Sequence, residues 1–135
     1  MAVVVGYVPT PEGRAALSAA REEARDRQLK LIVVNSHKGG ASFEGEDSIR
    51  TDEELEAVRR ELEKDVADFE VLELVRGNDP TEDLIEVAAE VGAALIVIGL
   101  RRRTPIGKLV LGSNAQRILL EADCPVLSVK APRHG

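Results

Sequence analysis

The segment from Arg101 to Asn114 contains the residue types that bind anions. Four of the chain's 18 Lys and Arg residues fall within eight positions, although the formal net charge of the whole chain is −6: Arg101, Arg102, Arg103 and Lys108. Gly112-Ser113-Asn114 follows at the expected start of a helix. The free amides and the dipole of a helix N-terminus favour an anion. Gly112 has no Cβ to block close approach, and Ser113 can either cap the helix or donate to a phosphate oxygen.

The same segment also has a purely structural interpretation. Gly112-Ser113 can be a simple junction between a loop and a helix, and the arginines can be solvated or paired with acidic neighbours. A glycine-serine helix start is a weak motif when it stands alone. The residues by themselves therefore leave both interpretations open.

Short β-branched runs alternate with helical segments along the whole chain. We expect strands at 3–8, 31–35, 69–75, 94–99 and 125–130. Helices are expected at 10–27, 51–68, 79–91 and from 113 onward. Strands that are apolar throughout are typical of a parallel sheet buried on both faces, whereas the alternation in 69–75 indicates an edge strand with one wet face. The pattern predicts an α/β fold with a single three-layer domain over residues 1–135 and a mostly parallel five-stranded sheet.

Turn and capping residues set the expected element boundaries. Thr10 followed by Pro11 predicts the start of the first helix, and Thr51 before three acidic residues predicts the start of the second. Gly92 is expected to end the third helix as a C-cap. Three glycines make 36–50 an expected loop. Ligands of such sheets bind beyond the carboxyl ends of strands where strand order reverses, so the loops after strands one, two and four are the expected site.

Composition excludes several classes of protein. Aromatic residues make up 2% of the chain and the net charge is negative, which disfavours nucleic-acid binding. No apolar run approaches the roughly 20 residues that span a bilayer, and the N-terminus lacks a signal-peptide pattern. The single cysteine, Cys124, excludes an intrachain disulfide and is expected to be a small buried hydrophobe. These features predict a cytoplasmic protein.

The residue types needed for strong catalysis are missing. The loops after the first and fourth strands contain no histidine, and His37 has no obvious partner. A Walker Lys–Ser/Thr element, a Ser–His pair and a clustered acidic metal site are also lacking. A phosphoacceptor of the response-regulator type would need an aspartate where the third strand ends in Val75-Arg76. We therefore expect no enzyme.

The chain resembles the universal stress protein family, most specifically in the segment from the fourth to the fifth expected strand. The family signature is a glycine ending strand four, two residues, a second glycine, nine residues, then glycine and serine or threonine. Gly99 and Gly112-Ser113 match it at the right spacing, while Arg102 takes the place of the second glycine. The following segment 116–129, with its Cys-Pro turn, is similar to the family's last helix and strand. The resemblance covers residues 3–130.

This resemblance implies a fold, a ligand and a partner. The fold is Rossmann-like (of the HUP type), with strand order 3-2-1-4-5. The ligand is ATP or AMP, with Mg²⁺ only where nucleotide is bound. Val34 would face the adenine, and Gly99, Gly112, Ser113 and Asn114 would surround the ribose and phosphates. The end of strand one and the basic loop complete the candidate site with Val8, Pro9, Arg101 and Arg102. The partner is a second copy paired along Val126, Leu127, Ser128 and Val129.

Two departures from the family pattern leave two functions open. Val8 stands where ATP-binding members usually have an aspartate, and its side chain accepts no hydrogen bond. Arg102 can either fill the space of the phosphates or bind one through its guanidinium. The chain is thus either a dimeric stress-response protein with a modified nucleotide site, or a family member that has lost ATP binding and acts only through protein interactions.

Overall fold

The computed structural model describes residues 1–37, 46–75, 80–100 and 112–131. Its elements alternate between strand and helix in the order β1 (Ala2–Gly6), α1 (Pro11–Arg27), β2 (Lys30–His37), α2 (Glu46–Glu63), β3 (Phe69–Val75), α3 (Pro80–Val91), β4 (Ala93–Leu100), α4 (Ser113–Glu121) and β5 (Val126–Lys130). The predicted α/β alternation is confirmed.

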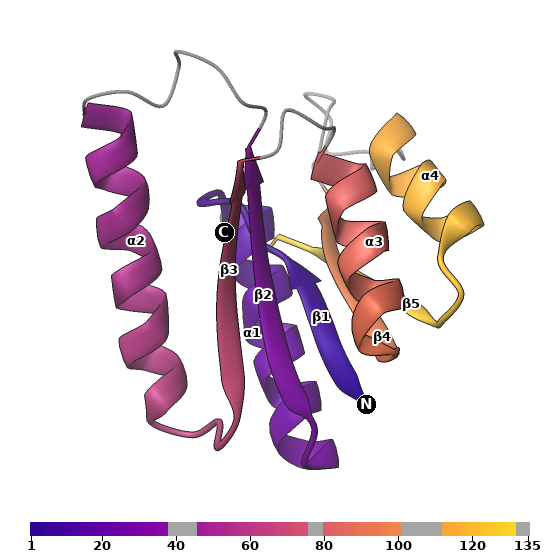
Figure 1. Cartoon of the computed structure of the whole chain (residues 1–135), viewed down its shortest axis with the longest axis horizontal. Helices are drawn as coiled ribbons and strands as arrows, with labels where there is room; N and C mark the ends of the chain where they lie inside the picture. Colours follow the sequence, from indigo (N-terminus) through magenta and orange to yellow (C-terminus); the bar gives the residue numbers. More distant parts are fainter. Residues whose placement is uncertain (38–45, 76–79, 101–111, 132–135) are drawn as a thin grey trace.

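The five strands form one parallel sheet in the order β3-β2-β1-β4-β5. The central strand β1 pairs with β2 on one side and β4 on the other, so that Val5 stands opposite Val33 and Val97. Because all pairs are parallel, the carboxyl ends of the strands lie at one edge of the sheet, as the arrows of β1, β2 and β3 show (Figure 1). The expected strand order and the edge position of β3 are confirmed. The central strands lie between two layers of helices, which explains their continuous apolar sequences.

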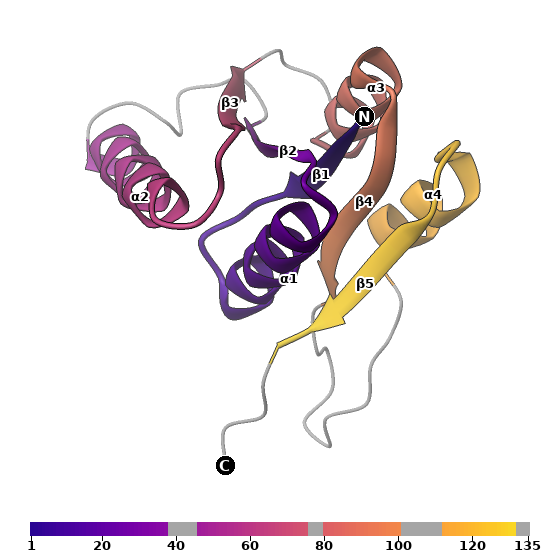
Figure 2. The ribbon, with the colours of Figure 1, turned by 90° about the horizontal axis from the view of Figure 1, so that it is seen from below.

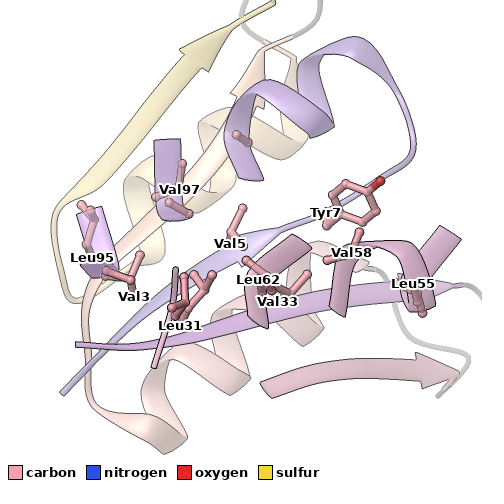
Figure 3. Packing of buried hydrophobic residues seen from close by; sticks show 14 residues of the cluster. Val3, Val5, Tyr7, Leu31, Val33, Leu55, Val58, Leu62, Leu95 and Val97 are labelled. Atoms are coloured by element: carbon pink, nitrogen blue, oxygen red, sulfur yellow. The ribbon is translucent and has the colours of Figure 1, made fainter. Parts of the chain in front are cut away.

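The helices cover both faces of the sheet, with α1 and α2 on one face and α3 and α4 on the other (Figure 2). Alternate residues of each strand therefore enter two separate cores. Val3, Val5 and Tyr7 pack with small residues of α1 and with two leucines and one valine of α2 (Figure 3). Ala2 and Val4 pack with residues of α3 and α4 instead.

Local capping signals explain two helix boundaries. The Thr10 hydroxyl accepts a hydrogen bond from the Gly13 amide at 3.1 Å, and Pro11 occupies the first turn, as expected. Helix α3 ends before Gly92, whose φ of 62° is the left-handed conformation that glycine adopts without strain. Both predicted caps are confirmed.

The prediction that the second helix starts at Thr51 was wrong. Helix α2 begins at Glu46, so Thr51 lies inside the helix and does not cap it. A Thr-acid pattern can occur inside a helix as well as at its start, because only the preceding residues decide whether the helix continues. The helix also ends at Glu63, before the expected 68, since the amides of Lys64, Asp65 and Val66 close a turn onto carbonyls of residues 61 and 62.

The strand ends differ from those expected by a few residues. Strand β1 stops at Gly6, although the Tyr7 amide still donates to the Val34 carbonyl at 2.9 Å. Strand β2 extends to His37, so residues 36–37 and 46–50 belong to regular elements and not to the expected loop. The remainder of that loop (38–45), residues 76–79 and the basic loop (101–111) lie outside the described residues.

Candidate functional site

The sheet has one topological switch point, between β1 and β4. Strand β1 leads to α1 on one face, while β4 is followed along the chain by α4 on the other face. In open parallel sheets the crevice beyond the carboxyl ends of two such strands is the usual ligand site. The described residues at this edge include Val8, Pro9, Gly99 and the start of α4 at Gly112.

The turn between β1 and α1 is fixed by close backbone packing. The Thr10 amide donates to the Val8 carbonyl at 2.8 Å, and the Arg14 amide donates to the Thr10 carbonyl at 2.9 Å. A Cβ atom at Gly13 would overlap the Val8 carbonyl oxygen. The turn therefore presents a defined backbone to the crevice, with the Val8 side chain 45% exposed and Pro9 exposed as well.

Gly99 has a packing role on the α1 face of the sheet. A Cβ atom at this position would overlap the carbonyl oxygen of Glu12 in the first turn of α1. The absence of a side chain thus lets α1 lie directly on the end of β4. The space beside its Cα on this face is taken by α1. The expected contact of Gly99 with ribose or phosphate stays a prediction.

The N-terminus of α4 lacks a side-chain cap. Gly112 is the N-cap residue, with φ −71° and ψ 164°, and its carbonyl accepts from the Gln116 amide at 3.0 Å. Ser113 is the first helical residue and not the N-cap, so of the two roles open to its hydroxyl the structure does not show capping. Ser113 and Asn114 are exposed. In contrast to α1, which Thr10 caps, α4 has no side-chain cap from its N-cap residue, so among the described residues no N-cap side chain accepts from its first amides.

Val34 lies in the core below α3. Its side chain is 2% exposed and packs among Leu84, Val87 and Ile98. A base at this edge would therefore meet the Val34 backbone more readily than its side chain. The expected contact with adenine stays a prediction. Arg101 and Arg102 lie outside the described residues.

Sequence reasoning missed a polar cluster next to Val8, which joins the residue after β1 to α1 and α2. The Tyr7 hydroxyl donates to Glu54 Oε1 at 2.5 Å, and Arg14 Nη2 lies 3.6 Å from the same oxygen. Burial is the main reason, and the Glu54 carboxylate a second one, why the pKa of Tyr7 lies well above its usual range. The one signal in the sequence is a tyrosine among apolar neighbours. Its partner Glu54 could not be inferred, because the two residues are 47 positions apart in the chain.

Two hollows lie away from the switch point. One, of about 220 Å³, runs between α1 and α2 and is bordered by Tyr7, Arg14 and Glu54. The other, of about 290 Å³, lies between α3 and the turn before β5 and is lined by Cys124. Cys124 is only partly buried, yet burial, followed by the charge of Asp123, raises the pKa of its thiol. The expectation of a buried hydrophobe was therefore only partly right, while the raised pKa keeps the thiol in its less reactive protonated form.

Neither a metal site nor a membrane span is found in the part of the chain that the structure describes. In residues 1–37, 46–75, 80–100 and 112–131, no three His, Cys, Asp or Glu side chains gather as metal ligands would. Within the same ranges no helix is long and apolar enough to cross a membrane.

The family model described as the universal stress protein family matches residues 1–130. The chain belongs to the universal stress protein family. A universal stress protein of Mycolicibacterium smegmatis is 42% identical over 133 residues, which cover 98% of each chain.

Two solved structures of universal stress proteins are similar to this family member and contain adenine nucleotides. The protein from Archaeoglobus fulgidus in complex with dAMP is 35% identical, with a TM-score of 0.77 over 96% of this chain and 98% of that one. A universal stress protein in complex with cAMP is 25% identical, with a TM-score of 0.71 over 98% of each chain. Both bound molecules are adenine nucleotides with one phosphate.

Proposed function

We propose that this universal stress protein binds an adenine nucleotide at the carboxyl edge between β1 and β4 and acts in the stress response as a dimer. The observation that carries the proposal is the start of α4, where Gly112 leaves the first amides without a side-chain cap. Helix N-termini of this kind bind phosphate through these amides and the helix dipole. The complex of a relative with dAMP supports the same ligand class.

The residues favour a nucleotide with one phosphate. Beside the switch point, the described residues include the start of α4, which has no side-chain cap, and, at the end of β1, the exposed hydrocarbon side chain of Val8. One set of amides matches one phosphate group. Arg101 and Arg102 are the cations that we expect to add affinity for ATP, with Mg²⁺ only when nucleotide is bound.

A second function is favoured by Val8 itself. A carboxylate at this position would accept hydrogen bonds from a ribose, whereas valine accepts none. Loss of one such polar partner costs about 1–3 kcal/mol, which is a factor of about 5 to 150 in affinity. A family member with this loss would act only as a dimeric protein-interaction module.

Dimerisation through β5 is supported by the position of this strand. Strand β5 pairs only with β4 among the described residues, and its Leu127 side chain is 36% exposed. A bare edge with apolar side chains invites pairing with another strand, and a second copy related by a twofold axis would satisfy it. We further propose that the protein acts by binding and not by catalysis, and that it works in the cytoplasm.

Calorimetric titration of the full chain with AMP, dAMP and ATP, with and without Mg²⁺, tests the proposal. We expect micromolar dissociation constants, and weaker ATP binding for Arg102→Ala. GMP serves as the control for the base. A folded dimer that releases no heat with any nucleotide at millimolar concentration would favour the interaction module instead.

A further inference from the structure

Tyr7 connects the proposed site to the helix layer on the α1 and α2 face. It directly precedes Val8, and its amide holds the end of β1 to β2 through the Val34 carbonyl, at 2.9 Å. Its side chain is 2% exposed and belongs to the same core cluster as Leu55 and Val58 of α2 (Figure 3). The ring is therefore fixed by α2 at one end and by the backbone of the site at the other.

The Tyr7 hydroxyl is the polar end of this connection. It donates to Glu54 Oε1 at 2.5 Å, and Arg14 Nη2 approaches the same oxygen at 3.6 Å. We call Tyr7, Arg14 and Glu54 the Tyr7 junction. Because burial keeps the pKa of Tyr7 high, the phenol remains a hydrogen-bond donor throughout the physiological range.

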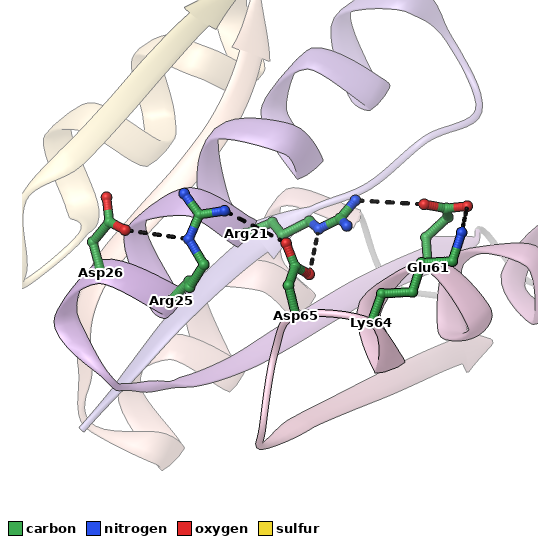
Figure 4. A network of polar contacts seen from close by, with 6 residues as sticks. All are labelled: Arg21, Arg25, Asp26, Glu61, Lys64 and Asp65. Carbon is green, nitrogen blue, oxygen red and sulfur yellow. Dashed lines mark hydrogen bonds and ion pairs between the residues drawn. The ribbon is translucent and has the colours of Figure 1, made fainter.

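Helix α2 has a separate polar attachment at its C-terminal end. Arg21 of α1 donates to Asp65 at 2.7 Å and lies 3.7 Å from Glu61 (Figure 4). Arg25 lies 3.6 Å from the other Asp65 oxygen. Of these two attachments, only the Tyr7 junction is next in sequence to a residue of the proposed site. The Asp65 attachment therefore serves as an internal reference.

We propose that Tyr7 is a positioning residue that couples the docking of α2 to ligand binding at the carboxyl end of β1. The inference rests on the proposed function. A ligand that contacts the Val8 backbone adds a further restraint to the adjoining Tyr7 ring and so stabilises its bond to Glu54. Coupling between two sites is reciprocal, so a docked α2 strengthens ligand binding by the same factor. Only part of the free energy of this one hydrogen bond is coupled to the ligand, so we expect a factor of about 3- to 10-fold.

Hydrogen exchange and nucleotide titration of the full chain test the coupling. Tyr7→Phe keeps the ring and removes the donor, whereas Glu54→Ala removes the acceptor from the α2 side without altering β1. We expect AMP to slow amide exchange in residues 53–63 of the wild type. Both variants should lose this protection and bind AMP about 3- to 10-fold more weakly, and the double variant should bind no more weakly than either single one.

The control variant is Asp65→Asn, which weakens the distant attachment. It should speed exchange near the C-terminal end of α2 and leave AMP affinity unchanged. Wild-type affinity in both Glu54→Ala and Tyr7→Phe, with AMP protection of α2 retained, would overturn the coupling but leave the nucleotide site intact. If Tyr7→Phe fails to fold, Glu54→Ala decides alone. Absence of AMP binding to the wild type would instead overturn the proposed function, and the coupling with it.

Discussion

Gly13 in the first turn of α1 lies directly against the carbonyl oxygen of Val8, with no room for a Cβ atom between them. This contact brings the helix start onto the β1–α1 turn. Together with the Thr10 cap, it determines which backbone groups the turn shows to the proposed ligand. The integrity of the site thus depends on a glycine that contributes no functional group.

Substitution of Gly13 by alanine should destabilise the protein and weaken nucleotide binding. The added methyl group must displace the Val8 carbonyl, and overpacking of this kind costs about 1–3 kcal/mol. Urea denaturation measures the free energy of unfolding, and AMP titration measures the effect on the site.

Gly92→Ala is the matched control for this prediction. A Cβ at Gly92 meets nothing within 4 Å, but its φ of 62° makes alanine strained by about 1–2 kcal/mol. It should therefore lower stability without changing AMP affinity. Equal affinities for Gly13→Ala and wild type would show that the Val8 turn does not shape the site.

The buried Tyr7 hydroxyl should make stability fall at alkaline pH. Its pKa is raised in the folded protein, so the folded state retains a proton that the unfolded state loses above about pH 10. The stabilisation is present below pH 10 and is lost as the pH rises toward the folded pKa. Denaturation of wild type and Tyr7→Phe from pH 8 to 11 should show a steeper decline for the wild type. An equal decline in stability for wild type and Tyr7→Phe would contradict the burial of the Tyr7 hydroxyl.

Val8→Asp should strengthen adenine nucleotide binding. The side chain is exposed next to the crevice, so a carboxylate there is solvated and can accept from a ribose hydroxyl. We expect about 5- to 150-fold higher affinity for AMP, corresponding to about 1–3 kcal/mol. Val8→Thr, which is similar in size but uncharged, serves as the comparison. An unchanged affinity for Val8→Asp would place the ribose away from β1.

Ser128→Pro should reduce dimerisation while leaving the monomer folded. Ile96 donates to the Pro125 carbonyl at 3.0 Å and pairs with Val126, so in this parallel ladder Leu127 directs its amide to β4 and Ser128 directs its amide outward. A proline at an outward position removes a donor only from the free edge. Sedimentation at micromolar concentration should show more monomer than for Ser128→Ala. A fully dimeric Ser128→Pro would exclude pairing through β5.

The fold was largely predictable because its signals are local. The apolar runs that became β1, β2 and β4 are recognisable without knowledge of their partners, and Thr10 and Gly92 cap their helices with adjacent residues. Thr51 failed as a signal because its role depended on residues 46–50, which continue the helix. The candidate site was less predictable. Gly99 matches a ligand-binding motif, yet in the structure the lack of a side chain at this position lets α1 pack against the end of β4.

The sequence by itself determined the alternation of elements, the family and the glycine-serine start of α4, because each depends on neighbouring residues or on a fixed spacing. Only the tertiary structure decided that Gly13 and Gly99 lie against backbone oxygens, and that Tyr7 meets Glu54 and Arg14. These contacts join residues that are distant along the chain or lie on different layers. Their distances follow from how α1 and α2 pack on the sheet, which no local pattern specifies.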